Sequence, residues 1–426
     1  MINDPEFSED ARQSARRAVE ALRSGVPNGA SVRALGTTQL HIVDRFEGLL
    51  RDTSKEASDR SAPGMIIKGG FGSGKSHLLE YLGEVALDRN FVVSKIVISK
   101  ETQLHNTTSM FRAAIASAKV PQRSGTAVAE IASALNFDSS NYVNFYTWLH
   151  RPESKLDQRL CASLRLFQNY QGDDEFVEKI TNFWAGEPYP IAEMRKRLRE
   201  AGWLGDYSLR AAKEIDLSLD RFAFVSRLIL AAGFSGWVLL IDEVELIGRY
   251  SLMQRAKSYA EIRRWVEGSK KYLDTPIISV LTTVDDFEGE VLIGKGDYIK
   301  VPQRLTAKDR LEETKLSIDA IAGMKILGSR QSELKSPDEN ELNATYEAIR
   351  KIHGTAYGWD PPHVSGLERL SSNRMRQYVR AWINEWDLIR LDPDYVPETT
   401  VSAVEIEYGE DDDLTQSPLF EVADNS

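Results

Sequence analysis

A glycine-rich segment ending in lysine and serine is the part of this sequence most able to do chemistry. It reads Gly69-Gly70-Phe71-Gly72-Ser73-Gly74-Lys75-Ser76 and fits the P-loop pattern GxxxxGK[ST]. Glycines at such positions let successive backbone N–H groups turn inward and cradle phosphates at a helix N-terminus. Lys75 is then expected to reach the β- and γ-phosphates, and Ser76 to bind Mg²⁺. We therefore predict an ATP and Mg²⁺ site formed by residues 69–76 together with His77.

Two acids follow directly on an apolar segment much further along the chain. The segment covers residues 236–241 and is followed by Asp242 and Glu243. A strand-terminal aspartate can hold Mg²⁺ directly or through water, and the next glutamate can orient and polarise an attacking water. An exposed pair of loop acids is the alternative. Because the chain also carries a P-loop, we interpret the pair as a Walker B motif, with Glu245 on the helix that follows.

Hydroxyl and guanidinium groups offer further candidates. Thr282 and Thr283 end the apolar segment 276–283, which resembles the sensor strand of AAA+ ATPases; the alternative is that they only cap a strand. Arg374, Arg376 and Arg380 lie in the last helical pattern, 371–390. In AAA+ proteins a lid arginine reaches back to the nucleotide, and Arg376 best resembles that arginine. The alternative is that these arginines lie on the surface or form ion pairs. The predicted catalytic set is therefore Lys75, Glu243, Thr282, Thr283 and Arg376.

Apolar segments separated by helical patterns define the expected fold. We predict strands at residues 65–67, 91–98, 236–241 and 276–283, and a shorter one at 298–301. Near-continuous apolar strands alternating with helices indicate a parallel sheet covered on both faces. The predicted class is α/β, an AAA+-like P-loop NTPase sheet with a large helical insertion at about 105–235 and a C-terminal helical lid.

Four regions follow from these patterns. We expect an N-terminal helical segment at 1–60, the ATPase core at 61–305, the lid at 306–396 and a disordered acidic tail at 397–426. The net charge of −11 comes from the C-terminal end, since residues 391–426 hold eleven acids and no lysine or arginine. The remaining chain is neutral, with 53 acids and 53 bases. This balance of charges argues neither for nor against the binding of nucleic acid.

The composition excludes several protein classes. With 42% hydrophobic residues and 27% charged residues, the chain is ordinary for a globular protein. No apolar stretch is long enough to span a bilayer, so we expect no membrane contact. The N-terminus lacks the basic start and the apolar core that a secretory signal would have. A single cysteine, Cys161, suits a reducing compartment, and we predict a cytoplasmic protein.

Several longer segments resemble the ATP-binding proteins of bacterial BREX phage-defence systems. They are residues 16–28, 99–102, 111–114, 240–245 and 376–387, and the resemblance covers residues 10–390. It implies an AAA+-like ATPase in an antiviral operon with a DNA methyltransferase and a phosphatase-like partner. One departure from the AAA+ pattern concerns the arginine finger, because residues 284–300 contain no arginine. Arg263, Arg264 and Arg304 remain as alternatives.

Three functions are compatible with these features. The leading hypothesis is an ATPase whose nucleotide state controls assembly or remodelling of a defence complex on DNA, with self-association as an option. The second is a nucleotide-dependent scaffold with little turnover. The third is a DNA-loading, initiator-like ATPase, which would need a basic groove. The densest basic cluster, at 195–199, is interpreted as a solvated helix face.

The tail contains one short apolar motif. Gln416-Ser417-Pro418-Leu419-Phe420 stands in an otherwise acidic stretch and resembles the peptides that dock bacterial DNA-metabolism proteins on the sliding clamp. We predict that Leu419 and Phe420 anchor the clamp or another defence subunit. The alternative is two apolar residues placed there by chance.

Overall fold

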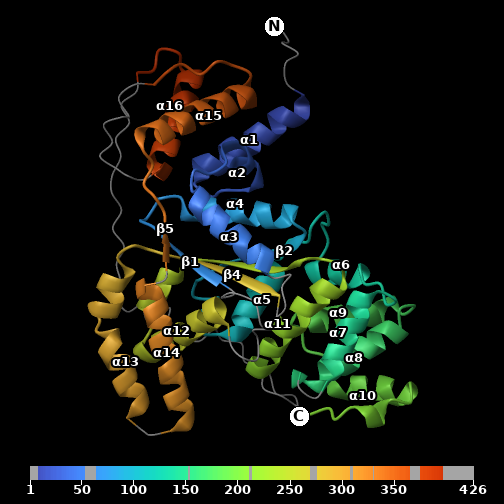
Figure 1. The fold of residues 1–426 in the computed structure, drawn as a ribbon. Helices are drawn as coiled ribbons and strands as arrows, with labels where there is room; N and C mark the ends of the chain where they lie inside the picture. The colour runs from blue at the N-terminus through green and yellow to red at the C-terminus, as the bar shows by residue number, and fades with distance from the viewer. Residues whose placement is uncertain are drawn as a thin grey trace.

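The computed structural model describes residues 8–52, 64–151, 154–210, 214–268, 276–307, 310–329, 331–364 and 375–396. Arg374 and the tail motif at 416–420 lie outside this part of the chain. The described residues form an α/β structure with a five-stranded parallel sheet (Figure 1). Its strands are β1 (Gly64–Lys68), β2 (Phe91–Val97), β3 (Gly236–Asp242), β4 (Ile277–Thr283) and β5 (Gln331–Glu333). They are arranged in the order β2-β3-β4-β1-β5.

The predicted parallel sheet is confirmed, and four of its strands match the apolar segments. The strand predicted at 298–301 is wrong, because these residues lie in helix α13 (Asp297–Thr306). Val301 and Leu305 are buried while Ile299 is exposed, so the apolar side chains follow the helical period and not the alternation of a strand. The fifth strand is β5, which pairs with β1. Gly296, in the left-handed region at φ 74°, precedes α13 as its N-cap.

The register brings the carboxyl ends of the central strands to one edge of the sheet. Ile67 of β1 pairs with Thr282 of β4, and Leu281 of β4 pairs with Ile241 of β3. Side chains alternate between the two faces along each strand. Asp242 and Thr282 therefore lie on the same face as Val280, which is packed under the helix that follows β1.

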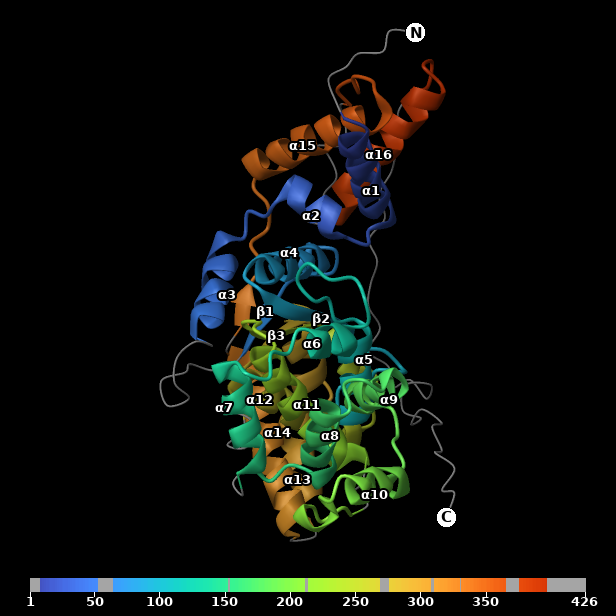
Figure 2. The same ribbon diagram turned by 90° about the vertical axis from the view of Figure 1, so that its right-hand side faces the viewer.

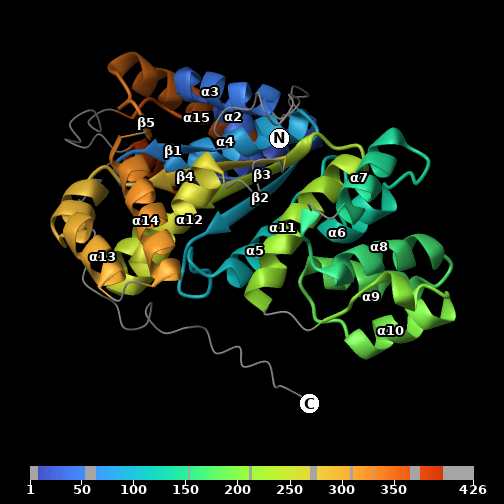
Figure 3. The same ribbon diagram turned by 60° about the horizontal axis from the view of Figure 1, so that its bottom comes forward.

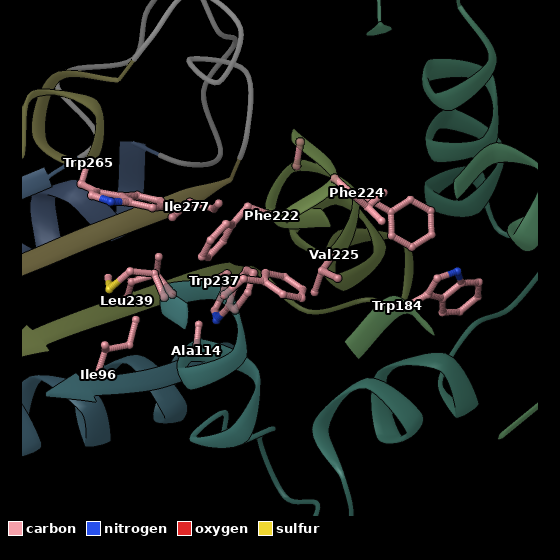
Figure 4. Close-up of a cluster of buried hydrophobic side chains, with 14 of the residues drawn as sticks. Ile96, Ala114, Trp184, Phe222, Phe224, Val225, Trp237, Leu239, Trp265 and Ile277 are labelled. Carbon is pink, nitrogen blue, oxygen red and sulfur yellow. The ribbon is translucent and has the colours of Figure 1, made fainter. Parts of the chain in front are cut away.

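Different helices cover the two faces of the sheet. Helices α3 (Leu40–Asp52) and α4 (Lys75–Asp88) lie on one face, and α12 (Leu252–Glu267) and α14 (Leu311–Ser329) lie on the other (Figure 1). Figure 4 shows part of the core on the second face, where Phe222 packs against Trp237 with ring centroids 5.6 Å apart. The indole N–H of Trp237 donates to Ser94 Oγ at 2.8 Å, so this buried polar group is satisfied.

A helical insertion separates β2 from β3 and extends from the β2 side of the sheet (Figure 3). It contains α5 (Thr107–Ala116), α6 (Ala127–Ser133), α7 (Ser140–His150), α8 (Gln158–Asn169), α9 (Asp174–Ala185), α10 (Ile191–Glu200), η3 (Leu204–Asp206) and α11 (Glu214–Ala231). The basic cluster lies on α10. There Arg197 donates to Asp173 at 2.9 Å and Arg195 donates to the Leu209 carbonyl at 2.9 Å. Part of this cluster thus holds the insertion together.

A second group of helices lies on the α4 side of the sheet, away from the insertion (Figure 2). Helices α1 (Glu9–Ser24), α15 (Glu339–Tyr357) and α16 (Met375–Leu391) share a separate apolar core, and we call these three helices the helical cap. Arg23 of α1 pairs with Asp387 of α16 at 2.6 Å. Helix α2 (Gly29–Leu35) connects the cap to α4.

The packing of the helical cap crosses two of the expected domain boundaries. Its core joins the N-terminal α1 to α15 and α16, which lie more than three hundred residues later. By contrast, α14 and β5 pack with the sheet although both follow residue 306. The domain limits therefore remain predictions, and the observed packing groups α1 with α15 and α16 next to the loop that follows β1.

Candidate functional site

The loop between β1 and α4 has the backbone geometry of an anion cradle. Gly72 and Gly74 adopt φ values of 77° and 102°, which residues with side chains rarely reach. Gly74 is the N-cap of α4 and supplies no side-chain hydrogen bond to the helix. The first N–H groups of α4 therefore need a partner from outside the helix, and an anion can provide one.

Lys75 and Ser76 begin helix α4 directly above the strand ends. The Lys75 side chain is only 7% exposed, and its Nζ donates to the Gly69 carbonyl at 2.7 Å and the Gly70 carbonyl at 3.1 Å. Ser76 Oγ donates to Asp242 Oδ2 at 2.8 Å. Ser73 Oγ is buried without a hydrogen-bond partner. An oxygen-rich ligand entering this loop would satisfy that hydroxyl.

Asp242 joins the loop to the neighbouring strand. Its Oδ1 accepts hydrogen bonds from Thr282 Oγ1 at 2.5 Å and from the Glu243 backbone N–H at 3.1 Å. Thr283 lies elsewhere, because alternation along β4 directs it to the opposite face. Its buried hydroxyl has no hydrogen-bond partner, and only its carbonyl reaches the loop, at 3.2 Å from the Gly69 nitrogen. Of the two predicted threonines, the structure therefore brings Thr282 to the aspartate.

Glu243 sits at the turn that leaves the sheet. Its φ of 61° and ψ of 34° place it in the left-handed region, and it is the N-cap of the short helix η4 (Val244–Arg249). Such a conformation is costly for glutamate and is typical of functional sites. Burial, together with the nearby Asp242 carboxylate, raises the pKa of Glu243, while Lys75 and Arg376 act in the opposite direction. The carboxylate therefore lies among the charged residues of the loop.

Glu245 belongs to the same cluster, which the sequence did not predict. It is only 2% exposed, and its Oε2 has no hydrogen-bond partner. Burial raises the pKa of Glu245 to about 8, with Glu243 and Asp242 adding to the rise and Lys75 opposing it. As predicted, Glu245 lies on the helix that follows the strand, the short helix η4. The tight turn at Glu243 returns it to the site, and the acidic spacing of Asp242, Glu243 and Glu245 was the available signal.

Arg376 of the helical cap reaches the loop. Its backbone N–H donates to the Gly72 carbonyl at 3.3 Å, and its guanidinium carbon lies 5.7 Å from the centre of the Phe71 ring. Arg380, one turn further along α16, is exposed. The site therefore receives residues from two separate cores, the sheet and the cap.

A pocket with a free volume of about 160 Å³ lies between the loop and the helical cap. Its lining residues include Leu22, Gly25, Pro27, Leu35, Gly36, Thr37, Thr38, Gln39, Ser73, Gly74, Ser76, His77, Leu334, Lys335, Met375, Arg376 and Val379. The His77 Nε2–H donates to the Gly36 carbonyl at 3.0 Å, and burial lowers the pKa of this ring. His77 thus forms a pocket wall. The sequence missed the contribution of residues 36–39, which hydrogen bonds between Gln39 and Lys335 tie to the segment after β5.

The three arginines considered as alternatives for the arginine finger differ in their surroundings. Arg263 of α12 pairs with Asp319 and with Glu267, the latter at 3.5 Å. Arg264 pairs with Glu261 at 3.0 Å. Arg304 is exposed in the last turn of α13. It is the exposed arginine among these three.

The comparisons with known proteins give one family. Residues 11–387 match the family of BREX system ATP-binding proteins BrxC/D. No curated protein and no solved structure shows a significant match. In the described part of the chain, no helix combines the length and apolar character needed to cross a membrane. Since the match covers most of the sequence, this chain belongs to the BrxC/D family of BREX system ATP-binding proteins.

Proposed function

We propose that this chain is a Mg²⁺-dependent, AAA+-like P-loop ATPase of a BREX antiviral system. Its nucleotide state would control assembly or remodelling of the other subunits, among them a methyltransferase and a phosphatase-like protein, on DNA. The observation that carries this proposal is the hydrogen-bonded connection from Ser76 through Asp242 to Thr282, with Lys75 and Glu243 beside it. Membership of an ATP-binding family supports the nucleotide.

The residues present fit a nucleotide with its metal ion. The glycine turn at Gly72 and Gly74, the uncapped N-terminus of α4 and the unpartnered Ser73 hydroxyl suit phosphate oxygens. Ser76 and Asp242 place a hydroxyl and a carboxylate oxygen 2.8 Å apart, and both are ligand types that Mg²⁺ accepts. When bound, Mg²⁺ neutralises charge on the β- and γ-phosphates. Lys75 would exchange its two loop carbonyls for those phosphates.

The chain's own residues then have distinct tasks. Thr282 orients the Asp242 carboxylate through its hydrogen bond. Glu243 polarises the attacking water, for which a pKa raised toward neutrality is favourable. Arg376 contributes a positive charge from the cap side of the loop. Glu243 follows the sheet, whereas Arg376 lies on the helical cap. A nucleotide that contacts both would therefore influence the position of the cap relative to the sheet.

The pocket beside the loop suits the base of the nucleotide. Its walls include apolar side chains from the cap, such as Leu22 and Val379, and the opposite wall carries the 36–39 segment. A mostly apolar cleft with a few polar groups is the usual form of such a site. A base bound here would contact α1 and α16 at once. This contact supports a role for nucleotide in setting the cap position.

A nucleotide-dependent scaffold with slow turnover is the second candidate. This candidate is supported by the ion pairs of Arg263 and Arg264. Two of the three arginines considered as an arginine finger are thus already engaged within the chain. The exposed Arg304 would then act only on a second copy of the chain. ATP turnover measured at rising protein concentration separates the two functions, because dependence on a second copy makes the specific activity rise with concentration.

We expect Lys75→Ala to weaken ATP binding by about 100-fold, because the lysine makes charge-assisted contacts to phosphate. The measurement is the dissociation constant of ATP with Mg²⁺ by calorimetry. Lys351→Ala, an exposed lysine on α15, is the matched control and should bind as the wild type does. Unchanged affinity in Lys75→Ala would exclude the loop as the phosphate site.

We expect Arg376→Ala to weaken ATP more than ADP, by about 10- to 100-fold, since a single contact to the γ-phosphate is lost. Arg380→Ala, on the exposed side of α16, serves as control. Dissociation constants for both nucleotides provide the comparison. An equal effect on ATP and ADP would assign Arg376 to loop support alone.

A further inference from the structure

The strained backbone of Glu243 has to be held from both sides. Its φ of 61° lies in the left-handed region, which a glutamate keeps only where the surrounding structure fixes the turn. On the side of the sheet, the Ile98 N–H donates to the Asp242 carbonyl at 3.0 Å, and the Glu243 N–H donates to Asp242 Oδ1 at 3.1 Å. On the other side, the Glu243 carbonyl accepts from the Leu246 N–H at 3.1 Å. The turn is thus stable only if η4 itself is anchored.

The far end of η4 is anchored by two cationic side chains. Lys295 Nζ donates to the Gly248 carbonyl at 2.9 Å. Arg255 Nη1 donates to the carbonyl of Tyr250, the residue directly after η4, at 2.5 Å. Arg255 lies on α12, and Lys295 lies just before α13. The end of η4 is therefore tied to the helices on the opposite face of the sheet from α4.

The Arg255 guanidinium is held by a buried carboxylate at the start of α13. Its side chain and that of Asp297 are 3% and 0% exposed. Arg255 Nε and Nη2 donate to the two Asp297 oxygens at 2.7 and 2.9 Å, and the Tyr259 hydroxyl donates to Asp297 Oδ2 at 2.6 Å. A buried ion pair adds little net stability, because the loss of hydration offsets the attraction. Its bidentate geometry does fix the guanidinium plane, and with it the direction of Nη1 toward Tyr250.

We propose that Arg255, held by Asp297, is a positioning residue that keeps Glu243 directed at the attacking water. This inference rests on the proposed ATPase function. Because β3 fixes one end of the turn and Arg255 fixes the end of η4, the Glu243 backbone cannot relax to an ordinary φ. Its carboxylate is thereby kept near Asp242. The phosphate contacts come from β1 and α4, so they do not depend on this anchor.

Replacing the buried network by apolar side chains tests the positioning role while keeping the core filled. The triple variant of Arg255→Met, Tyr259→Phe and Asp297→Leu leaves no buried charge unpaired, and such replacements often preserve stability. Its kcat should fall about 30-fold, because the charge-assisted hydrogen bond to η4 is lost, while the ATP dissociation constant stays within about twofold. Tyr259→Phe alone keeps the bond from Arg255 to Tyr250 and should turn over ATP as the wild type does. Wild-type kcat in the triple variant, or an equal loss of ATP affinity and kcat, would overturn the proposal.

A milder substitution tests the same contact with the buried charge still paired. Arg255→Lys keeps a cation next to Asp297, but one ammonium nitrogen cannot replace the three guanidinium nitrogens that bond Asp297 and Tyr250. We expect kcat to fall about 10-fold with unchanged ATP affinity. Wild-type kcat in this variant would also contradict the proposal.

Hydrogen exchange of the nucleotide-free chain gives a readout that does not depend on turnover. The amides of residues 244–250 should exchange about 10-fold faster in Arg255→Lys and in the triple variant than in the wild type, because η4 has lost the contact at its end. The amides of α4 should exchange at the wild-type rate and serve as the internal control. Unchanged exchange over residues 244–250, or a uniform increase along the chain, would refute the anchor.

Failure of this inference and failure of the proposed function give different results. A wild-type chain that binds ATP without turning it over refutes the ATPase function, and with it the positioning role. A wild-type chain that turns over ATP, with Arg255→Lys and the triple variant equally active, refutes the positioning role alone.

Discussion

Replacing Glu243 by glutamine is expected to leave ATP affinity within about twofold of wild type and to lower turnover about a thousandfold. The amide cannot accept the proton of the attacking water, whereas the phosphate contacts come from the loop and from Lys75. The effect should therefore lie in kcat and not in binding. Single-turnover hydrolysis and calorimetric ATP binding measure the two quantities on the same preparation.

An exposed glutamate provides the control for this substitution. Glu290→Gln changes the same group at an exposed position in the helical segment 288–293 and should leave kcat unaltered. If Glu243→Gln retained wild-type turnover, the base would have to be sought elsewhere in the site.

The fold could be predicted where strands are buried on both faces. Residues 236–241 and 277–281 are near-continuous apolar runs because both sides of these central strands, β3 and β4, pack against helices. β5 is different, since Gln331–Glu333 is a short polar strand at the edge of the described sheet, where it pairs with β1. Its sequence contains no apolar pattern to find. At 298–301, apolar composition alone suggests a strand. The four-residue spacing of the buried Val301 and Leu305 instead indicates a helix.

The site divides in the same way between local and long-range information. The loop at 69–76 and the acids after β3 are local motifs, and the structure brings Lys75, Ser76, Asp242 and Thr282 together. Thr283 could have been separated from Thr282 by alternation alone. The pocket walls depend on α1 meeting α16 across the whole chain. An amphipathic helix shows which face is buried but does not identify its partner.

Substituting Gly323 by alanine is expected to give the largest loss of stability, about 3 kcal/mol. Gly323 lies on α14 where that helix crosses α12. A Cβ added there would lie 1.8 Å from the Tyr259 carbonyl oxygen and 2.6 Å from its carbonyl carbon. Both atoms belong to backbone, so relief requires one helix to move as a whole. Urea unfolding followed by circular dichroism should show a lower midpoint.

The same substitution on another helix separates this close approach from helix propensity. Gly48 lies inside α3, and among the described residues a Cβ there would meet only Arg51 Nη2, at 4.0 Å. Gly48→Ala should therefore stabilise the chain by about 0.5–1 kcal/mol, as alanine does in a helix interior. Equal urea midpoints for the two variants would mean that α12 and α14 can move apart at little cost in stability. The clash also bears on the candidate site, because the Tyr259 hydroxyl donates to Asp297 at 2.6 Å and Asp297 pairs with Arg255. Arg255 in turn donates to the carbonyl of Tyr250, the residue directly after η4.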